Sequence, residues 1–463
     1  MPTNNPLILK TLVLTIAGSL LLSQSALADQ YHYKDILVGD RAAGLAGAYT
    51  AIADDASGLY YNPAGVVYTS KPKISGSVNA YNYKATTYKG ISKANPNQKW
   101  TRTSSGMVAN YFGVVQPLGD SSIGFSIAIP NYEIEDQSDS FTNLQASQRL
   151  INNGATYNLS GGATETFKAA ANNAITKQAI DYNNQDTTTL AGISFATPIL
   201  NNLSFGATLY AYMRKKEQTL KMKSIIKGTS SGTNAVSVLE DSFYQKVQSE
   251  EFGIQPRLGL MWSPVDKLSL GLMVQTTLMI SETPKSRIDQ NLCSTEGCFK
   301  YDETSDGFQE MSNTDILNQN IGLKDTSKND LPVEVNLGAA YFATDALLYT
   351  ADFSYASATD TYQATWNIAG ATEYFFNPSL AIRGGLYTNN ANSSSDVAND
   401  LVDHVNFIGG SFSATRYTKA SNITVGINYS TGSGEANLFN SSNNTQDINV
   451  SAINLFISTS ASF

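Results

Sequence analysis

SAINLFISTSASF, residues 451–463, ends the sequence and places an apolar or small side chain at every second position. The alternate positions are Ile453, Leu455, Ile457, Thr459, Ala461 and Phe463. Successive side chains of a β-strand point to opposite faces, so this spacing predicts a strand with one apolar face. Residues 122–129 repeat the pattern, with Ile123, Phe125, Ile127 and Ile129 on one face and Gly124, Ser126 and Ala128 on the other.

Alternating segments of this kind recur from Lys73 to the end of the sequence. No block of about 18 apolar residues follows residue 29, which excludes transmembrane helices. Strands of about ten residues with one lipid-facing side are instead typical of a membrane β-barrel. The aromatic Phe463 resembles the signal by which the barrel assembly machinery recognises outer-membrane strands. A periplasmic all-β domain is the alternative.

Turn residues between the alternating segments predict fourteen strands in residues 71–463. They are expected to begin near Lys73, Gly106, Ser122, Thr188, Leu203, Glu251, Leu268, Pro332, Leu347, Ala364, Leu380, Phe407, Ile423 and Ile448. Short turns should face the periplasm, and long extracellular loops are expected at about 135–186, 215–248 and 281–331. The predicted fold is an all-β, 14-stranded antiparallel transmembrane barrel.

The start of the sequence predicts export. Lys10, the short apolar run Thr11–Leu22 and the small residues Ala26-Leu27-Ala28 form the pattern of a secretory signal peptide, expected to comprise residues 1–28. In an exported protein, Cys293 and Cys298 are expected to form a disulfide.

The sequence gives little indication of nucleic-acid binding, metal binding or enzyme activity. The formal net charge of −9 argues against nucleic acid as a partner. The two histidines, His32 and His404, lie far from the cysteines, so no metal site is expected. The sequence contains no nucleophile elbow, HExxH motif or phosphate loop, and we expect neither enzyme activity nor a cofactor.

A fourteen-strand barrel is wider than its wall side chains can fill, because about eight strands already enclose just enough room for them. Either the bore conducts water and ions, or another segment fills it. Residues 29–70 precede the first strand, lack alternation and are rich in Gly and Ala. We therefore expect them to form a plug, called the hatch below.

The sequence GDRAAGLAGAYTAIADDASGLYYNPAG, Gly39–Gly65, closely resembles the amino-terminal hatch of the FadL/TodX family of hydrocarbon and long-chain fatty-acid transporters. The matching positions are Gly44, Gly47, Ala48, Ala53, Asp54, Asp55, Ala56, Ser57, Asn62, Pro63, Ala64 and Gly65. The resemblance implies a hatched barrel in the Gram-negative outer membrane, surrounded by lipid and lipopolysaccharide. It also implies a monomer that takes up hydrophobic small molecules passively.

Ile129-Pro130 is similar to the kinked third strand of the same family. A proline donates no hydrogen bond to a β-ladder, so it is tolerated at edges, ends or bulges. The resemblance implies that Pro130 marks a lateral opening in the wall. The alternative is that Pro130 only ends the strand.

Alternation places several further side chains in the bore. Arg257 and Arg383 either hold hatch carboxylates such as Asp54 and Asp55 or bind a substrate carboxylate. Four apolar or aromatic side chains either line a ligand pocket or pack against the hatch, namely Tyr210, Tyr212, Met261 and Met273. Outside the bore, Phe167, Ala170, Ala171, Ala174 and Ile175 have helical spacing and predict an amphipathic helix.

The predicted function is passive uptake of long-chain fatty acids, aromatic hydrocarbons or alkanes, with release near the third strand. The sequence does not choose among these substrates. Two alternatives keep the barrel: a general diffusion porin, and a non-transport scaffold associated with secretion or the cell surface.

Overall fold

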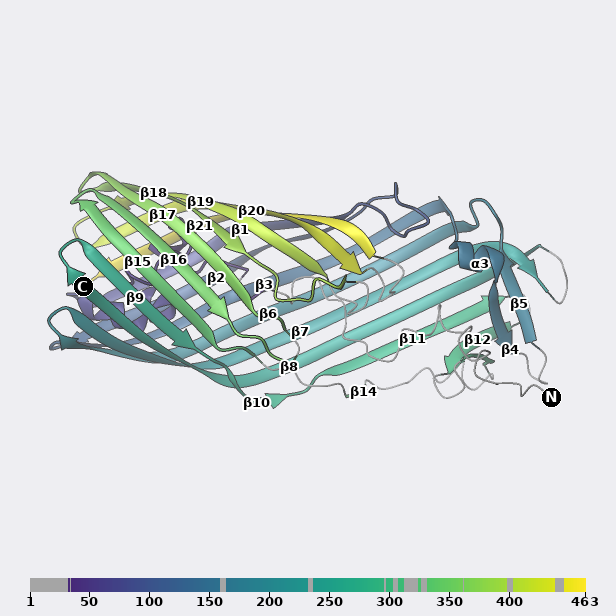
Figure 1. Ribbon diagram of the computed structural model, residues 1–463, viewed down its shortest axis with the longest axis horizontal. Helices are drawn as coiled ribbons and strands as arrows, with labels where there is room; N and C mark the ends of the chain where they lie inside the picture. Colours follow the sequence, from purple (N-terminus) through teal and green to yellow (C-terminus); the bar gives the residue numbers. More distant parts are fainter. Residues whose placement is uncertain are drawn as a thin grey trace, which may run out of the picture.

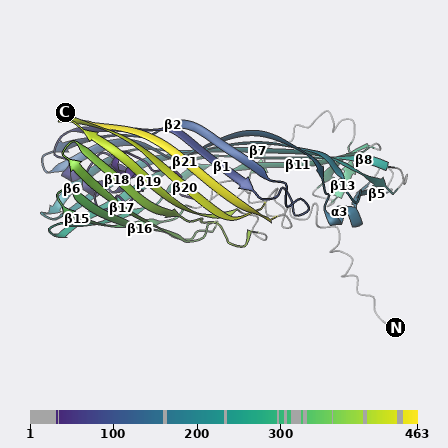
Figure 2. The same cartoon turned by 90° about the horizontal axis from the view of Figure 1, so that it is seen from above.

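In the computed structural model, long antiparallel strands form a closed barrel, and the ladder ends where the first strand pairs with the last (Figures 1 and 2). The structure describes residues 32–33, 35–158, 164–231, 236–294, 297–302, 307–311, 324–325, 331–360, 362–397, 403–437 and 445–463. The predicted signal peptide lies outside these residues. Among them, no helix is both long enough and apolar enough to cross a membrane.

Fourteen strands build the wall, as predicted. They are β1 Lys73–Tyr88, β2 Trp100–Leu118, β3 Ser121–Leu144, β6 Ile175–Leu200, β7 Leu203–Ser230, β8 Val236–Val265, β9 Leu268–Gln275, β15 Glu334–Thr344, β16 Leu347–Ala356, β17 Thr365–Asn377, β18 Leu380–Asn389, β19 His404–Tyr417, β20 Ser421–Asn437 and β21 Thr445–Ser462. The short strand β10, Leu278–Glu282, continues the course of β9 along β8.

The outer face of the wall is apolar. Ile123 and Phe125 are 43% and 40% exposed, while Ser126 and Ala128 beside them are fully buried on the inner face. In β21, Leu455 and Ile457 are exposed and Phe456 is buried in the bore. Both strands therefore have the orientation that alternation predicts, and an outer surface of this kind is suited to lipid.

The expected loops at 135–186 and 215–248 are wrong in large part. Strand β3 runs on to Leu144, β6 begins at Ile175, and β7 and β8 pair from Leu203↔Trp262 to Thr229↔Val236. Figure 1 shows these strands projecting far beyond the rest of the barrel. Above the membrane neither face meets lipid, so the apolar alternation ceases although the backbone ladder continues.

Several short elements complete this extension. They are α3 Gln148–Asn152, β4 Ala155–Asn158, β5 Thr164–Ala169, β11 Lys285–Ser294, β12 Gly297–Asp302, β13 Gly307–Glu310 and β14 Lys324–Asp325. The helix expected from Phe167 to Ile175 is also wrong. Phe167 lies on β5, which pairs with β7, and is buried in an apolar core with Leu150 and Phe299. Tertiary pairing thus overrides the helical spacing.

The predicted disulfide joins Cys293 of β11 to Cys298 of β12. The two residues are directly opposite each other in the β11–β12 pair. Strand β11 in turn pairs with β8, from Lys285↔Gln248 to Cys293↔Glu240. The loop expected at 281–331 therefore contains a hairpin that continues the extension.

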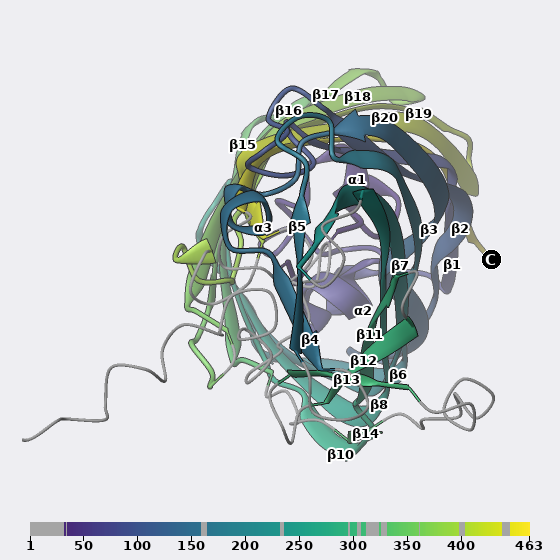
Figure 3. The same cartoon turned by 90° about the vertical axis from the view of Figure 1, so that its right-hand side faces the viewer.

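The hatch lies inside the barrel. It contains α1 Arg41–Gly44, α2 Gly58–Tyr61 and the 3₁₀ helix η1 Pro63–Tyr68. Viewed along the barrel, α2 lies within the ring of strands (Figure 3). Helix η1 packs against β6, β7 and β8, and α1 against β18, β19 and β20, so the hatch reaches across the bore.

Candidate functional site: a blocked bore beside a gap in the wall

Glycines of the wall let the hatch backbone approach the strands closely. A Cβ atom on Gly206 would lie 2.3 Å from the carbonyl carbon of Pro63, and one on Gly271 would lie 2.2 Å from the carbonyl oxygen of Thr50. Conversely, a Cβ atom on hatch Gly44 would lie 2.1 Å from Ser413 Oγ on β19. The wall glycines are thus required by close contact with the hatch backbone, and Gly44 leaves room for the Ser413 side chain.

Asn62 connects the hatch to itself and to the wall. Its Nδ2 donates to the carbonyl oxygens of Thr50 at 2.8 Å and Leu260 at 3.0 Å, and its Oδ1 accepts from Ala64 N at 3.1 Å. Ser204 Oγ of β7 donates to the Ala64 carbonyl at 2.9 Å. The Asn-Pro-Ala segment therefore has a structural role. Gly47 adopts a positive φ of 80°, which favours glycine.

An ionic cluster, called the latch below, ties the hatch to the opposite wall. Arg41 of α1 lies 2.6 Å from Glu373 of β17 and 2.8 Å from hatch Asp54. Glu373, which is fully buried, also accepts a hydrogen bond from Arg383 of β18. The expected polarity is therefore reversed: the hatch supplies an arginine and the wall a carboxylate. Asp55 caps the turn before α2, accepting from Ser57 N at 2.7 Å.

Arg257 of β8 also binds the hatch. It is 2% exposed, donates to the Tyr60 carbonyl, and stacks over the rings of Tyr60 at 4.1 Å and Tyr210 at 5.1 Å. Arg383 donates to Glu373, Thr415 and Tyr417. Arg257 thus bonds directly to the hatch backbone, whereas Arg383 is linked to the hatch only through Glu373, which also binds Arg41.

The apolar residues expected to line a ligand pocket divide into two groups. Tyr210, Tyr212 and Met261 share a buried cluster with hatch residues, and Tyr210 OH lies 3.2 Å from the Leu59 carbonyl oxygen. Met273 is buried without lining a described cavity. Tyr212, together with Arg257, lines a small cavity of about 70 Å³ that also touches Pro130. Three of the four residues thus share the buried cluster of the hatch, and Tyr212 lines the small cavity as well.

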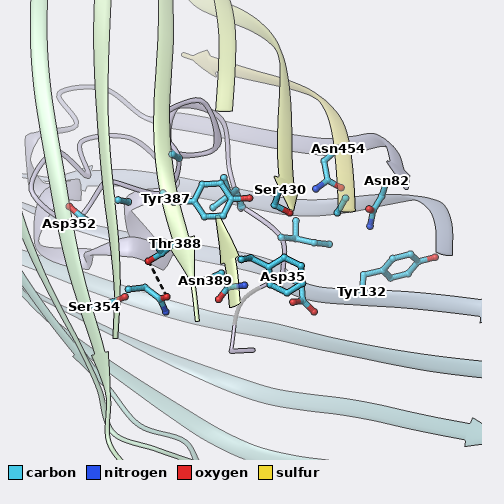
Figure 4. Close-up of a pocket in the computed structure, with 18 of the residues that line it drawn as sticks. Asp35, Asn82, Tyr132, Asp352, Ser354, Tyr387, Thr388, Asn389, Ser430 and Asn454 are labelled. Atoms are coloured by element: carbon cyan, nitrogen blue, oxygen red, sulfur yellow. Dashed lines mark hydrogen bonds between the residues drawn. The ribbon is translucent and has the colours of Figure 1, made fainter. Parts of the chain in front are cut away.

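A second cavity, called the chamber below, has a volume of about 140 Å³ and lies against the hatch (Figure 4). Hatch residues Asp35, Ile36 and Tyr60 form part of its lining. Many strands contribute the other lining residues, which include Asn82, Tyr132, Asn336, Ser354, Tyr387, Asn389 and Asn454. None of these residues was predicted as part of a site. Alternation predicts that such residues face the bore but not how far they lie from the hatch.

The wall is interrupted beside the chamber. Strands β2 and β3 pair at Ser104↔Glu135 and again from Tyr111↔Ala128, with no pairs between. We call this interruption, residues 105–110 and 129–134, the wall gap. Its edge residues Ser104 and Tyr132 line the chamber.

Pro130 lies within this gap, in the middle of β3. The pairing of β3 with β6 shifts register between Ala128 and Asn131, so Pro130 occupies a bulge. Since β3 continues to Leu144, the alternative that Pro130 ends the strand is wrong. The Pro130 carbonyl accepts from hatch Asp35 N at 3.2 Å and Ile36 N at 3.0 Å, which joins the hatch to the edge of the gap.

His32 lies just before this contact. Its Nε2 donates to the Val405 carbonyl at 2.9 Å, and its ring packs edge-on against Phe407 at 4.8 Å. Burial lowers the pKa of His32 to about 4, whereas the hydrogen bond to Val405 acts in the opposite direction. The docked histidine is therefore neutral at pH 7.

We expect Glu373→Gln to loosen the hatch, because it leaves Arg41 and Arg383 without their shared carboxylate. Removing one partner of a buried ion pair costs about 3–5 kcal/mol. The variant should show faster hydrogen exchange in residues 39–69 and a larger ion current in planar bilayers. Asp447→Asn, which breaks the exposed Lys89–Asp447 pair, is the control. Equal currents from both variants would contradict the role of the latch.

Acidification should weaken docking of the first hatch residues through His32. A group whose pKa is lower when docked contributes fully above its undocked value of 6.5, and this contribution is lost as the pH falls toward 4. Burial raises the pKa of Asp35, which has the opposite effect because protonation then favours docking. Comparison with His32→Gln isolates the histidine.

Between pH 6.5 and 4, hydrogen exchange at Asp35 N and Ile36 N should accelerate in the wild type relative to His32→Gln. Identical pH profiles for the two proteins would rule out this role of His32. The exchange of Leu45 N, which bonds within the hatch itself, serves as an internal reference.

Comparison with known proteins defines the fold. No family model and no curated protein matches the sequence. Among solved structures, the toluene transporter TodX of P. putida has a TM-score of 0.56 at 13% identity, covering 93% of this chain and 99% of that one. A FadL homologue of Pseudomonas aeruginosa has a TM-score of 0.55 at 12% identity, covering 93% and 100%. The CymD monoaromatic hydrocarbon channel has a TM-score of 0.51 at 12% identity, covering 92% and 97%.

At this identity the comparisons establish architecture, and they confirm the fold that the hatch sequence implied. A closed fourteen-strand barrel with an apolar outer face is suited to the Gram-negative outer membrane, the predicted location. The chain has the fold of the FadL and TodX outer-membrane channels.

Proposed function

We propose that this protein admits small hydrophobic molecules through the outer membrane without an energy source. The molecule would pass from the extracellular extension into the chamber and leave through the wall gap into the bilayer. The observation that carries this proposal is the position of the chamber, between a hatch that crosses the bore and a break in the wall. The structurally similar TodX is a toluene transporter and CymD is a monoaromatic hydrocarbon channel, which supports a hydrophobic cargo.

The extension offers a first contact for the cargo. Strands β6, β7, β8, β11 and β12 line an open cavity of about 640 Å³, in which Met222, Phe243 and Tyr244 lie among charged side chains that include Lys221, Arg287 and Asp289. Methionine and aromatic side chains adapt to apolar ligands of varied shape. A molecule that the charged lipopolysaccharide layer excludes would be held there before it enters the bore.

Release requires movement of the hatch segment at the gap. The Asp35 and Ile36 amides bond to the Pro130 carbonyl, and both residues also line the chamber. A ligand shifts a conformational equilibrium only by its difference in affinity between two states. We infer that cargo in the chamber competes with the docked position of this segment, so that occupancy favours the released state.

A general diffusion porin is the principal rival. The hatch contacts with β7, β8 and β17 oppose it, because they occupy the bore that a porin leaves open. Purified protein in a planar bilayer should therefore pass little ion current. A scaffold role predicts unchanged uptake of hydrophobic compounds after deletion of the gene.

The direct test is accumulation of radiolabelled toluene by a deletion strain of the native host, with and without the restored gene. We expect accumulation to fall on deletion and to recover on restoration. Equal accumulation in all strains would refute the uptake proposal and favour a scaffold.

The wall gap has a separate test. Pro130→Val restores a backbone donor to β3, which should favour regular pairing across the gap and lower toluene accumulation. Pro117→Val, at the periplasmic end of β2 and paired with Ser122, is the matched control and should leave accumulation unchanged. Full uptake by Pro130→Val, with the protein present at normal abundance, would remove lateral release from the proposal.

A further inference from the structure

The chamber is polar for a site that would hold a hydrocarbon. Its lining carries the carboxamides of Asn82, Asn336, Asn367, Asn389 and Asn454. These residues come from β1, β15, β17, β18 and β21. Three of them, Asn82, Asn389 and Asn454, are labelled in Figure 4. A purely apolar cargo would displace water from these groups and return no hydrogen bond.

Two of the carboxamides are buried and have unmet hydrogen-bonding capacity. Asn336 is 6% exposed and Asn454 is 8% exposed, and the Oδ1 atom of each has no hydrogen-bond partner within the described chain. Asn454 lies directly opposite Asn82 in the β1–β21 pair, which places a second carboxamide beside it. Because buried polar groups in native proteins are usually paired, both point to a ligand or solvent that bonds to them.

The charge of the lining disfavours an anionic ligand. Three carboxylates line the chamber, on Asp35, Glu133 and Asp352, against one ammonium group, on Lys84. That ammonium lies 3.1 Å from Glu133. The cavity thus offers no cation beyond the one already paired, and a carboxylate head would meet two further acids.

The size of the chamber favours a single ring. Its volume of about 140 Å³ is close to that of an engineered apolar cavity, about 150 Å³, that binds benzene. Aromatic side chains are available to pack on such a ring, since Tyr60, Tyr61, Tyr132 and Phe407 all line the cavity.

We propose that the chamber selects a single-ring aromatic molecule with an uncharged hydroxyl head, a phenol, over the corresponding hydrocarbon or carboxylate. The ring would pack among the tyrosines while the hydroxyl group bonds to Asn454 or Asn336. This selectivity rests on the proposed function, since it assigns a substrate class to the same chamber.

The test compares toluene, p-cresol and p-toluate, which share a ring and a methyl group and differ in the head group. Binding to the purified full chain in detergent at pH 7.5 is measured by calorimetry, where p-cresol is neutral and p-toluate ionised. We expect p-cresol to bind most tightly and p-toluate most weakly. Toluene or p-toluate binding as tightly as p-cresol would overturn the inference.

Substitutions in the chamber test which side chain binds the hydroxyl group of p-cresol. Asn454→Leu and Asn336→Leu replace each carboxamide by an apolar side chain of similar size, and each should weaken p-cresol about fivefold while leaving toluene unchanged or tighter. Asn184→Leu is the control, because Asn184 is a buried residue of β6 that faces the bore but does not line the chamber. Should either buried variant fail to fold, the half-buried Asn82→Ala serves instead.

Uniform loss of p-cresol and toluene binding in the chamber variants, or no loss of either, would contradict the assignment of the hydroxyl partner. Different results would contradict the phenol selectivity and the uptake function. If the protein transports toluene and binds it as tightly as p-cresol, the phenol selectivity alone is wrong. If none of the three compounds binds and deletion does not change their uptake, the uptake function is wrong as well.

Discussion

A bilayer offers no partner for an unpaired backbone amide, and this constraint governs the wall. The barrel meets it by closing β1 onto β21, which leaves no free edge. In the wall gap between β2 and β3, some of the polar groups that lack a ladder partner find other partners. Pro130 has no amide hydrogen, its carbonyl accepts from the hatch, and the Ile134 amide donates to Ser104 Oγ at 3.3 Å. A break in the ladder is thus maintained by a proline, a serine and the hatch.

The diameter of the barrel imposes a second requirement, since fourteen strands enclose more space than their side chains fill. The hatch fills it by bringing backbone against backbone at Gly206 and Gly271, where any side chain would collide. Charges then fix its orientation, through Arg41 on one side and Arg257 on the other. The chamber is the space left over, and its position beside the gap follows from where the hatch ends.

Much of this architecture could be predicted from sequence, because lipid imposes a strict period of two. Ile123 and Leu455 face outward, the strand count is fourteen, and the cysteines are bonded, as expected. The prediction of strands from alternation fails in the extracellular extension, where the strands do not contact lipid. Residues such as Lys215 and Glu217 of β7 continue a strand whose outer face is no longer apolar, and Phe167 follows a pairing partner instead of its helical spacing. The site was harder to predict than the fold. Alternation shows whether a side chain faces the bore, but it does not show where along the barrel axis that side chain lies. Arg383 was correctly placed in the bore, yet its partner Glu373 and the chamber residue Asn454 were not identified.

The latch also bears on the order of biogenesis. The hatch leaves the ribosome first, but several side chains that hold it come from the last third of the chain: Asp352 accepts from its amides, Glu373 binds Arg41, and Ser458 Oγ donates to Asp40 Oδ1 at 2.8 Å. Contacts so distant in sequence form late, because the intervening chain must first be ordered. The hatch is therefore fixed in place only after the last strands have formed, and the bore is blocked at the stage when the barrel closes.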